Sequence, residues 1–374
     1  MIEILLAIFF ITVLLLFLSS GIWVAVSMIG VSSIGMILFT SRPVGDAMAT
    51  TIWGASSSWT LTALPLFVWM GEILFRTKLS ENLFEGLAPW LQKLPGGLIH
   101  VNVVGCALFA AISGSSAATV ATVGKMSIPE LRKRKYPEKI LLGSLAGSGT
   151  LGLLIPPSII LIIYGVTVQE SIAKLFIAGI IPGIMIALIF MGYVIIWSLL
   201  NKNKMPLTEE NYSFLNKLSK SKQLIPVILL ILGVIGSIYT GIATATEAAS
   251  LGVVGALILS YFQKSLNLKT FKESLLGATK TSCMIAFILA GATFLSLAMG
   301  FTGLPRNLAI WIQNMELSPY VLIFVLMIFY IILGMFLDGI SAVVLTMAII
   351  EPMIRQAGFD MIWFGIFLVI VVEM

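Results

Sequence analysis

Long apolar runs separated by short polar connectors dominate the pattern along this chain. Runs with the character of helical membrane spans lie near 2–18, 21–39, 61–75, 140–168, 175–200, 225–240, 244–262, 281–300 and from 361 onward. Two further apolar stretches, 98–131 and 320–354, are interrupted midway by polar and glycine residues. Each interrupted stretch predicts either a pair of spans or one re-entrant hairpin. The pattern therefore predicts an all-α polytopic membrane protein.

The composition agrees with a membrane protein and excludes several other classes of protein and site. The 374 residues are 59% hydrophobic and only 10% charged, which is far from the composition of a soluble domain. The first run, Ile4 to Leu18, lacks the basic residues of a signal peptide and is followed at once by a second run, so two helices are expected rather than a cleaved leader. Two cysteines provide no disulfide framework, and His100, the single histidine, excludes a multi-histidine metal site.

The basic residues indicate how the chain is oriented in the membrane. If both interrupted stretches enter and leave on one side, the connectors 76–97, 132–139, 202–223 and 263–280 share a face and carry 17 lysines and arginines. The opposite face receives four, namely Arg42, Lys174, Arg306 and Arg355. Positive residues mark the cytoplasmic side, so the connectors are predicted to be cytoplasmic and the N-terminus extracytoplasmic. The distribution of lysines and arginines is the same for hairpins and for pairs of spans, so it does not distinguish between them.

A weak internal repeat adds a second constraint. Asp338 to Ala342 matches Ser113 to Ala117 at an offset of 225, and offsets of 220 to 225 also align Gly241 with Gly21, Asn307 with Asn82, Pro319 with Pro95 and Gly365 with Gly143. The first copy begins outside and the second inside, so the copies are predicted to be inverted. The predicted domains are a first repeat 1–200, with hairpin 98–131 and broken helix 140–168, a basic cytoplasmic linker 201–224, and a second repeat 225–374, with hairpin 320–354. Interrupted helices in inverted repeats point to a transporter's binding site.

The connectors 79–94 and 305–316 correspond within this repeat. Leucines of the first connector recur at helical spacing, with charged residues elsewhere. A helix lying at the membrane interface is predicted, with Trp90 and Trp311 at headgroup level.

The first interrupted stretch and the broken helix that follows it carry the most informative polar residues. Ser113 to Thr119, S-G-S-S-A-A-T, places hydroxyls and a glycine where a membrane helix normally carries Leu or Val. Gly147 to Thr150 and Pro156-Pro157-Ser158 break the following apolar run. Freed carbonyls and hydroxyls are hard oxygen ligands suited to Na⁺, and nearby helix N-termini suit a carboxylate. Close helix packing at small residues, or a simple kink, is the structural alternative.

Three acidic positions need separate interpretations. Asp338, in Asp338-Gly339-Ile340-Ser341, either offers oxygen to a cation or caps the helix that starts near Ile340, and the two roles are compatible. Glu247 opens the span 244–262, where an acid suits the helix dipole, so a structural role is favoured. Glu72 lies near a span end and is expected to be interfacial or paired with a basic group.

No catalytic constellation is present in the sequence. H-E-x-x-H, G-x-S-x-G and a G-K-[ST] P-loop are all missing, so the chain is not expected to be an enzyme or to hydrolyse ATP. Energy for transport would then come from an ion gradient or from a partner.

Five segments together resemble one family over essentially the whole chain: S-G-S-S-A-A-T-V-A at 113–121, G-T-L-G-L-L-I-P-P-S at 149–158, I-A-G-I-I-P-G at 177–183, T-E-A-A at 246–249 and D-G-I-S at 338–341. They resemble the large membrane subunit of tripartite ATP-independent periplasmic (TRAP) transporters. The resemblance implies an inverted-repeat, elevator-type secondary transporter of the ion-transporter superfamily, with two re-entrant hairpins and broken helices, in the bacterial inner membrane. It also implies Na⁺-driven uptake of an organic acid, such as a sialic acid or a C4-dicarboxylate, a periplasmic substrate-binding protein, and a small four-helix membrane subunit.

The same resemblance assigns site residues by motif. Those expected to contact substrate are Ser115, Ser116, Thr119, Ser148, Pro156, Pro157 and Ser158. Those expected around Na⁺ are Ser113, Gly114, Ser116, Gly149, Thr150, Asp338, Gly339 and Ser341.

One departure from the family pattern concerns the second repeat. A counterpart of the Pro156-Pro157 break would fall near position 378, beyond Met374, so the second repeat is expected to be C-terminally incomplete, either truncated or incompletely given. A stand-alone Na⁺/carboxylate symporter of the same superfamily, an intramembrane enzyme and a purely structural subunit are the alternative functions.

Overall fold

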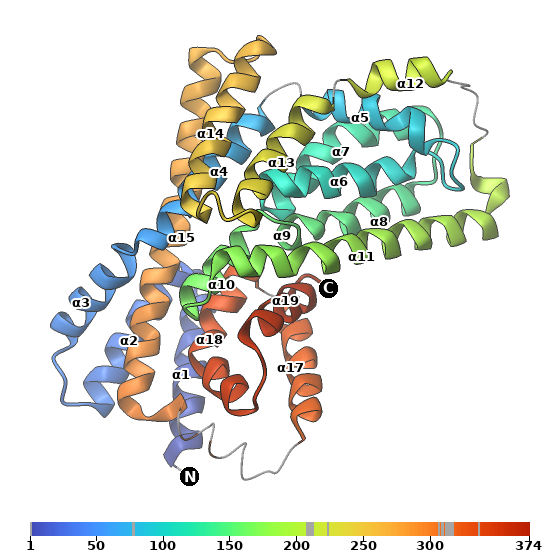
Figure 1. The fold of residues 1–374 in the computed structure, drawn as a ribbon. Coiled ribbons are helices and arrows are strands. Elements are labelled where there is room, and N and C mark those ends of the chain that lie inside the picture. The colour runs from blue at the N-terminus through green and yellow to red at the C-terminus, as the bar shows by residue number, and fades with distance from the viewer. Residues whose placement is uncertain are drawn as a thin grey trace. The chain divides into compact units, whose positions relative to one another are not determined.

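The computed structural model describes residues 2–76, 79–206, 213–222, 224–305, 307, 310, 318–335 and 337–374, with the side chains of 2–5, 7 and 79–82 set aside. Within these residues every regular element is a helix (Figure 1). The chain divides into two compact units that alternate along the sequence. Unit 1 comprises 1–62, 162–171 and 280–374, and unit 2 comprises 63–161 and 172–279. Each unit therefore draws on both predicted repeats.

Unit 1 is built from helices of the two chain ends. They are α1 (Ile2–Ser19), α2 (Val24–Phe39), α3 (Val44–Ser56), the 3₁₀ turn η1 (Trp59–Thr62), the later part of α15 (Leu268–Thr302), α17 (Pro319–Gly334), α18 (Gly339–Gln356) and α19 (Met361–Val372), joined by the end of α10 (Ile159–Thr167). Met36 on α2 and Phe294 and Ala298 on α15 form a fully buried cluster. Close packing at glycine is essential here, because a Cβ on Gly291 would lie 2.7 Å from the carbonyl oxygen of Ala25.

Unit 2 holds the middle of the chain. Its helices are α4 (Ala63–Phe75), α5 (Leu79–Leu91), α6 (Ile99–Ser113), α7 (Ser116–Lys133), α8 (Glu138–Gly149), α9 (Leu151–Leu154), α11 (Ile172–Leu200), the 3₁₀ turn η2 (Lys202–Lys204), α12 (Phe214–Ser221), α13 (Ile225–Tyr239), α14 (Ala245–Phe262) and the first turns of α10 and α15. Helices α6, α7 and α8 pack against one another, and α4 packs along α14.

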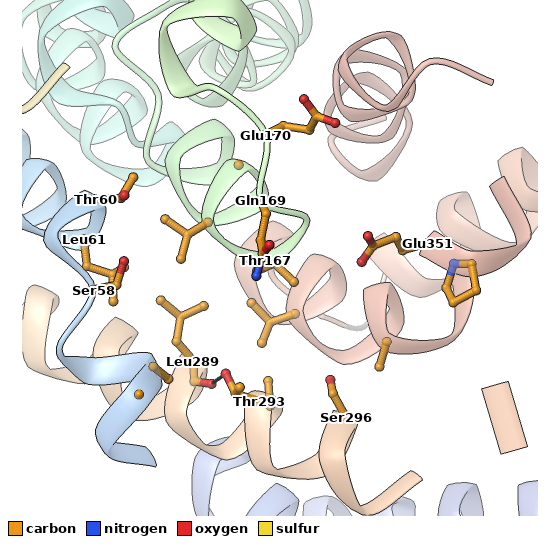
Figure 2. A pocket seen from close by; sticks show the side chains of 18 residues that line it. Ser58, Thr60, Leu61, Thr167, Gln169, Glu170, Leu289, Thr293, Ser296 and Glu351 are labelled. Carbon is orange, nitrogen blue, oxygen red and sulfur yellow. Dashed lines mark hydrogen bonds between the residues drawn. The ribbon is translucent and has the colours of Figure 1, made fainter. Parts of the chain in front are cut away.

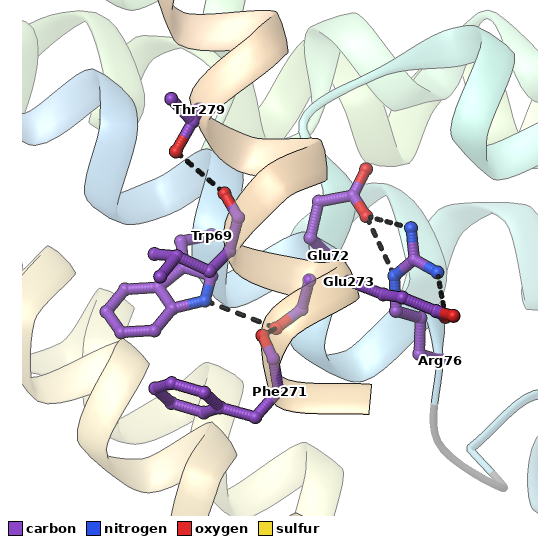
Figure 3. Close-up of polar contacts among 8 residues, drawn as sticks. Trp69, Glu72, Arg76, Phe271, Glu273 and Thr279 are labelled. Atoms are coloured by element: carbon purple, nitrogen blue, oxygen red, sulfur yellow. Dashed lines mark hydrogen bonds and ion pairs between the residues drawn. The ribbon is translucent and has the colours of Figure 1, made fainter. Parts of the chain in front are cut away.

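Polar contacts join α4 to the start of α15 in the same unit (Figure 3). Arg76 pairs with Glu72 at 3.2 Å on its own helix and with Glu273 at 3.1 Å on α15. The indole N–H of Trp69 donates to the hydroxyl of Ser274 at 3.3 Å. Glu72 is thus paired with a basic group, as predicted.

The helix bounds correct the sequence-based spans in two places. Helix α3 occupies a region that was predicted as a polar connector, because its apolar residues are too few for a hydropathy signal. Helix α15 begins at Leu268, well before the predicted start at 281, and Asn267 caps it by accepting from the N–H of Thr270 at 2.8 Å. By contrast, the predicted break within 140–168 is confirmed, since α8 and α9 meet α10 at a bend of 41°.

Several described helices have membrane-spanning character. Four of them, α11, α14, α15 and α18, are long and apolar enough to cross a bilayer, and the number rises to seven if each of three bent helix pairs counts as one span. The protein is therefore a multi-pass membrane protein.

The predicted interfacial helix 79–94 is α5. On its apolar face Leu83 and Leu87 are 1% and 9% exposed, whereas Trp90 and Leu94 are 42% and 36% exposed. The first two leucines pack within unit 2, and the interfacial position with Trp90 at headgroup level stays a prediction. Its predicted counterpart 305–316, with Trp311 and Arg306, lies mostly outside the described residues, as does Lys78.

The close approach of α15 to α2 generates a stability prediction. We expect Gly291→Ala to destabilise the protein by about 1–3 kcal/mol, because the added methyl group overlaps backbone rather than a flexible side chain. Gly300→Ala, on the same helix with no neighbour within 4 Å, is the matched control and should stabilise by up to about 1 kcal/mol through helix propensity. Thermal unfolding in detergent measures both, and equal shifts would contradict the packing at Gly291.

Candidate functional site

The break between α6 and α7 is a compact tip closed by its own hydroxyls. Helix α6 ends at Gly114, which has a positive φ of 59°, and Ser115 caps α7 by accepting from the N–H of Ala118 at 3.4 Å. The hydroxyl of Thr119 donates to the carbonyl of Ser115 at 2.8 Å, and the hydroxyls of Ser113 and Thr119 lie 2.8 Å apart. Thr119 is fully buried and Ser113 nearly so, whereas Ser115 and Ser116 are half-buried.

The helix break at 155–158 packs directly against this tip. The N–H of Ile159 donates to the carbonyl of Gly114 at 3.3 Å, and a Cβ on Gly114 would lie 2.8 Å from the carbonyl oxygen of Pro157. Glycine is required again at Gly152, where a Cβ would lie 2.6 Å from the carbonyl oxygen of Ser115. The tip and the broken helix therefore form one unit of structure, called here the tip–break assembly (residues 113–119 and 147–159).

The remaining predicted residues of this assembly have their hydroxyl protons engaged with carbonyls. Ser158 is fully buried, donates to the carbonyl of Leu153 and accepts from the N–H of Leu161 at 3.3 Å. Thr150 donates to the carbonyl of Gly147 at 2.7 Å, and the buried Ser148 donates to the carbonyl of Ser144. Pro156 and Pro157, joined by a cis peptide bond, complete the break.

The second tip, at residues 338–341, lies in unit 1, and a carboxylate caps its helix where the first tip uses a hydroxyl. The carboxylate of Asp338 accepts from the N–H of Ser341 at 3.2 Å and caps α18, so the predicted capping role is confirmed. Gly339 and Ser341 are buried, and the hydroxyl of Ser341 has no hydrogen-bond partner among the described residues. An unpaired buried hydroxyl needs an explanation. The expected two-sided site combines residues of different units and stays a prediction.

Two helix pairs reproduce each other in length and spacing. Helices α7 and α18 both have 18 residues, and α8 and α19 both have 12. In both cases the later helix begins 223 residues after the earlier one. Pro129 and Pro352 share this offset, as do Arg132 and Arg355. In this register Asp338 falls opposite Ser115, which caps the equivalent helix, rather than opposite Ser113.

A polar cavity of about 690 Å³ lies within unit 1 and contains none of the predicted residues (Figure 2). Its polar lining comprises Ser58, Thr60, Thr167, Gln169, Glu170, Thr293, Ser296 and Glu351. Figure 2 shows these side chains on the segment at η1, at the end of α10 and just after it, on α15 and on α18. The hydroxyls of Thr293 and Ser296, one turn apart inside an apolar run, were the sequence signal that could have indicated it.

Arg355 connects the two carboxylates of this cavity. Its guanidinium lies 2.9 Å from Glu351 and 3.8 Å from Glu170, and it donates to the carbonyl of Val168 at 3.0 Å. These contacts hold the segment after α10 against α18. One arginine between two glutamates leaves a net negative charge on this group of three.

The other acidic candidate has a structural role. Glu247 accepts from the N–H of Thr244 at 2.8 Å while the hydroxyl of Thr244 accepts from the N–H of Glu247, which is a complete capping box on α14. The favoured structural interpretation of Glu247 is confirmed. The described residues contain no group of three or more His, Cys, Asp or Glu that could hold a metal ion. The tip–break assembly itself contains no acidic residue, so its own side-chain and backbone oxygens are neutral.

A multi-pass helical chain whose helices break at a serine-rich tip and at a proline pair has the features of a membrane transport protein. Residues 11–374 match the family model described as the DctM component of the tripartite ATP-independent periplasmic transporters. The chain belongs to this family, as the sequence resemblance predicted. It is accordingly a transporter permease subunit and not an enzyme.

Named relatives agree with this assignment. The chain is 32% identical over 346 residues to the C4-dicarboxylate TRAP transporter large permease protein DctM of Pseudomonas aeruginosa, covering 92% of this chain and 80% of the relative. It is 31% identical over 352 residues to the protein of the same name from Rhodobacter capsulatus, covering 90% and 79%. It is 30% identical over 352 residues to the sialic acid TRAP transporter large permease protein SiaM of Vibrio cholerae, covering 93% and 81%.

The closed hydroxyl network of the tip generates a second prediction. We expect Thr119→Val to destabilise the protein by about 0.5–1.5 kcal/mol, since it removes the hydrogen bonds of the Thr119 hydroxyl with the Ser113 hydroxyl and with the carbonyl of Ser115, which keep only the longer 3.2 Å bond between them. Thr122→Val is the matched control, because the buried hydroxyl of Thr122 on the same helix has no partner among the described residues and its loss should be neutral or stabilising. Thermal unfolding of the two purified variants measures the difference. A Thr122→Val cost as large as that of Thr119→Val would contradict the assigned network.

Proposed function

We propose that this chain is the large membrane subunit of a Na⁺-driven importer of an organic acid in the bacterial inner membrane. In this proposal a periplasmic substrate-binding protein delivers the acid, and a small membrane subunit completes the transporter. The tip–break assembly is the observation that carries the proposal, because two helix interruptions meet there and are joined by the bond from Ile159 to Gly114. Membership in the TRAP family supports the partners.

The chemistry of the assembly fits a cation. Ser113 and Thr150 each have a carbonyl or hydroxyl oxygen nearby to receive their proton, which leaves hydroxyl lone pairs to face a ligand. Na⁺ prefers hard oxygen ligands of this kind. We assign Ser113, Gly114, Ser116, Gly149 and Thr150 to Na⁺ at the first tip. At the second tip we assign Asp338, Gly339 and Ser341.

The substrate assignment rests on the half-buried part of the same assembly. Ser115 and Ser116, at the N-terminus of α7, lie where helix N–H groups and the positive dipole end favour an anion. The other proposed substrate residues are buried behind these serines: Ser148 at the end of α8, and Pro156, Pro157 and Ser158 in the adjoining break. Thr119 holds the tip in shape from within. The relatives are named for C4-dicarboxylates and sialic acid, which are both carboxylates. A carboxylate is therefore the proposed substrate class.

The equal helix pairs support an inverted repeat. Helices α7 and α8 would recur as α18 and α19, with a capped tip before each pair and a proline at the same position in α7 and α18. A transport part containing both re-entrant hairpins would move against a fixed scaffold in an elevator-type cycle.

Reconstituted transport tests the coupling ion. The chain and its small subunit would be placed in liposomes, with the cognate binding protein added outside, and uptake of radiolabelled succinate and N-acetylneuraminate would be followed. We expect an inward Na⁺ gradient to support uptake and an equal K⁺ gradient to support none. Equal uptake with K⁺ would refute Na⁺ coupling, and uptake without the binding protein would identify a stand-alone symporter instead.

Substitutions at the tip test the site in the same assay. Ser116→Ala and Thr150→Val remove proposed Na⁺ ligands, so the half-saturating Na⁺ concentration should rise roughly tenfold, as loss of one charge-assisted contact would give. Ser250→Ala is the matched control, because this exposed hydroxyl on α14 makes a similar bond to its own helix, to Thr246 at 3.1 Å. Unchanged Na⁺ dependence in both tip variants would place the ion elsewhere.

A further inference from the structure

Four basic connectors lie together at one end of unit 2. The indole N–H of Trp90 donates to the hydroxyl of Ser221 at 2.7 Å and joins connector 76–97 to connector 202–223. The N–H of Leu98 donates to the hydroxyl of Tyr136 at 3.1 Å and joins the first connector to 132–139. The pair of Arg76 with Glu273 joins it to 263–280. These contacts agree with the prediction that the four connectors share a membrane face.

The described arginines at this end pair with acidic residues. Arg76 pairs with Glu72 and Glu273, Arg132 pairs with Glu138 at 2.8 Å, and Arg134 pairs with Glu130 at 2.8 Å. Several lysines have no carboxylate partner among the described residues: Lys93, Lys133, Lys135, Lys139, Lys202, Lys204, Lys217, Lys222, Lys264, Lys269 and Lys272. This end of the unit therefore carries a positive charge that its own acids do not neutralise.

Helix α12 attaches to this end through one side only. Phe214, Lys217 and Ser221 lie along one helical stripe, and all three contact Trp90: the two rings are 6.2 Å apart, and the ammonium of Lys217 lies 5.3 Å from the indole. The attachment leaves the rest of the helix surface uncovered.

The neighbouring stripe of α12 combines exposed leucines with lysine. Leu215 and Leu218 are 75% and 50% exposed, Phe214 is 66% exposed, and Lys222 follows one turn after Leu218. An exposed apolar stripe beside lysines is the pattern of a helix that lies in a membrane interface, with its apolar side in the acyl boundary and its ammonium groups among the headgroups.

The chain next to α12 places it near a bilayer surface. The apolar helix α13 starts at Ile225, three residues after Lys222. The lysines of α12 therefore stand directly before the start of an apolar helix, the position at which basic residues meet the membrane surface. The positive face of a membrane protein lies on the cytoplasmic side, where the lipid leaflet is anionic.

We propose that α12, together with Trp90, is a binding surface for the headgroups of anionic phospholipids in the cytoplasmic leaflet. Leu215 and Leu218 enter the acyl boundary, and Lys217 and Lys222 pair with lipid phosphates. The lipid thereby holds the linker between the two halves of the chain against the bilayer. This surface is separate from the tip–break assembly and does not depend on which ion or acid is transported.

A fluorescent probe on the leucine stripe tests the proposal. Leu218→Cys in a Cys283→Ser background, which leaves only the buried Cys106, would be labelled with the polarity-sensitive dye NBD in the full chain bound to its small subunit. Titration with phosphatidylglycerol should shift the emission to the blue, and phosphatidylcholine at the same concentration should not. Added salt should reverse the shift, because the contact is electrostatic. Leu215→Cys provides an independent labelled position on the same stripe.

Charge variants identify the lysines responsible. We expect Lys217→Gln and Lys222→Gln each to weaken the apparent affinity for phosphatidylglycerol about fivefold, the typical contribution of one lysine near an anionic surface. Lys269→Gln together with Lys272→Gln is the matched control, since these lysines lie at the start of α15 and not on α12.

Three outcomes would overturn the proposal. Equal blue shifts with both lipids would show that headgroup charge is not recognised. An equal loss of affinity in the α15 control would show that α12 is not the site. A probe shielded by the small subunit in the absence of added lipid would show that this face is a protein interface.

Discussion

The structure depends on one constraint: inside a bilayer no water is present to satisfy a backbone group that a helix leaves free. Four of the described breaks are closed locally by a side-chain cap. Ser115 caps α7, Ser158 accepts from the third residue of α10, Asp338 caps α18, and Asp360 accepts from the N–H of Trp363 at 2.9 Å. The bond from Ile159 to Gly114 goes further, because it satisfies two broken helices with each other. The breaks are thus structural elements in their own right.

Close contact between helices is the second requirement of the same environment, since lipid tails offer no hydrophobic gain for association. Glycines provide it where one backbone meets another. Gly152 lies against the carbonyl of Ser115, Gly291 against that of Ala25, and Gly334 against that of Val372. Each of these contacts admits no side chain, so the positions of the helices are set by backbone against backbone.

The sequence predicted the features that follow from local chemistry. Apolar runs identified most helices, and Pro156, Pro157 and the serines of 113–119 located the breaks, because proline and hydroxyl residues act on the backbone beside them. It did not reveal α3 or the polar cavity of unit 1. Helix α3 has no buried residue to give it a strong pattern, and the cavity is assembled from segments that lie more than 100 residues apart, such as Thr60, Thr167 and Thr293. The starts of α7 and α18 are 223 residues apart, whereas the motif match at Asp338 uses an offset of 225, because a short motif match ignores where a helix begins.

The need to satisfy polar groups without water also fixes where hydroxyl protons point, and this bears on the proposed binding of Na⁺ and a carboxylate. A hydroxyl that donates to a carbonyl has satisfied its proton and retains lone pairs, which suit a cation and not an anion. Ser113 and Thr150 are in this state, so the proposed cation side of the tip–break assembly presents acceptors. An anion needs donors, and the first turn of α7 provides them, because helix geometry leaves its leading N–H groups without intrahelical partners. In the proposed site, the cation ligands and the anion ligands would belong to the same assembly. A Na⁺ ion bound among the acceptors would lie beside the donors proposed for a carboxylate, and each charge would raise the affinity for the other. The proposed transport driven by an ion gradient requires coupled binding of this kind, and the way the breaks are capped is compatible with it.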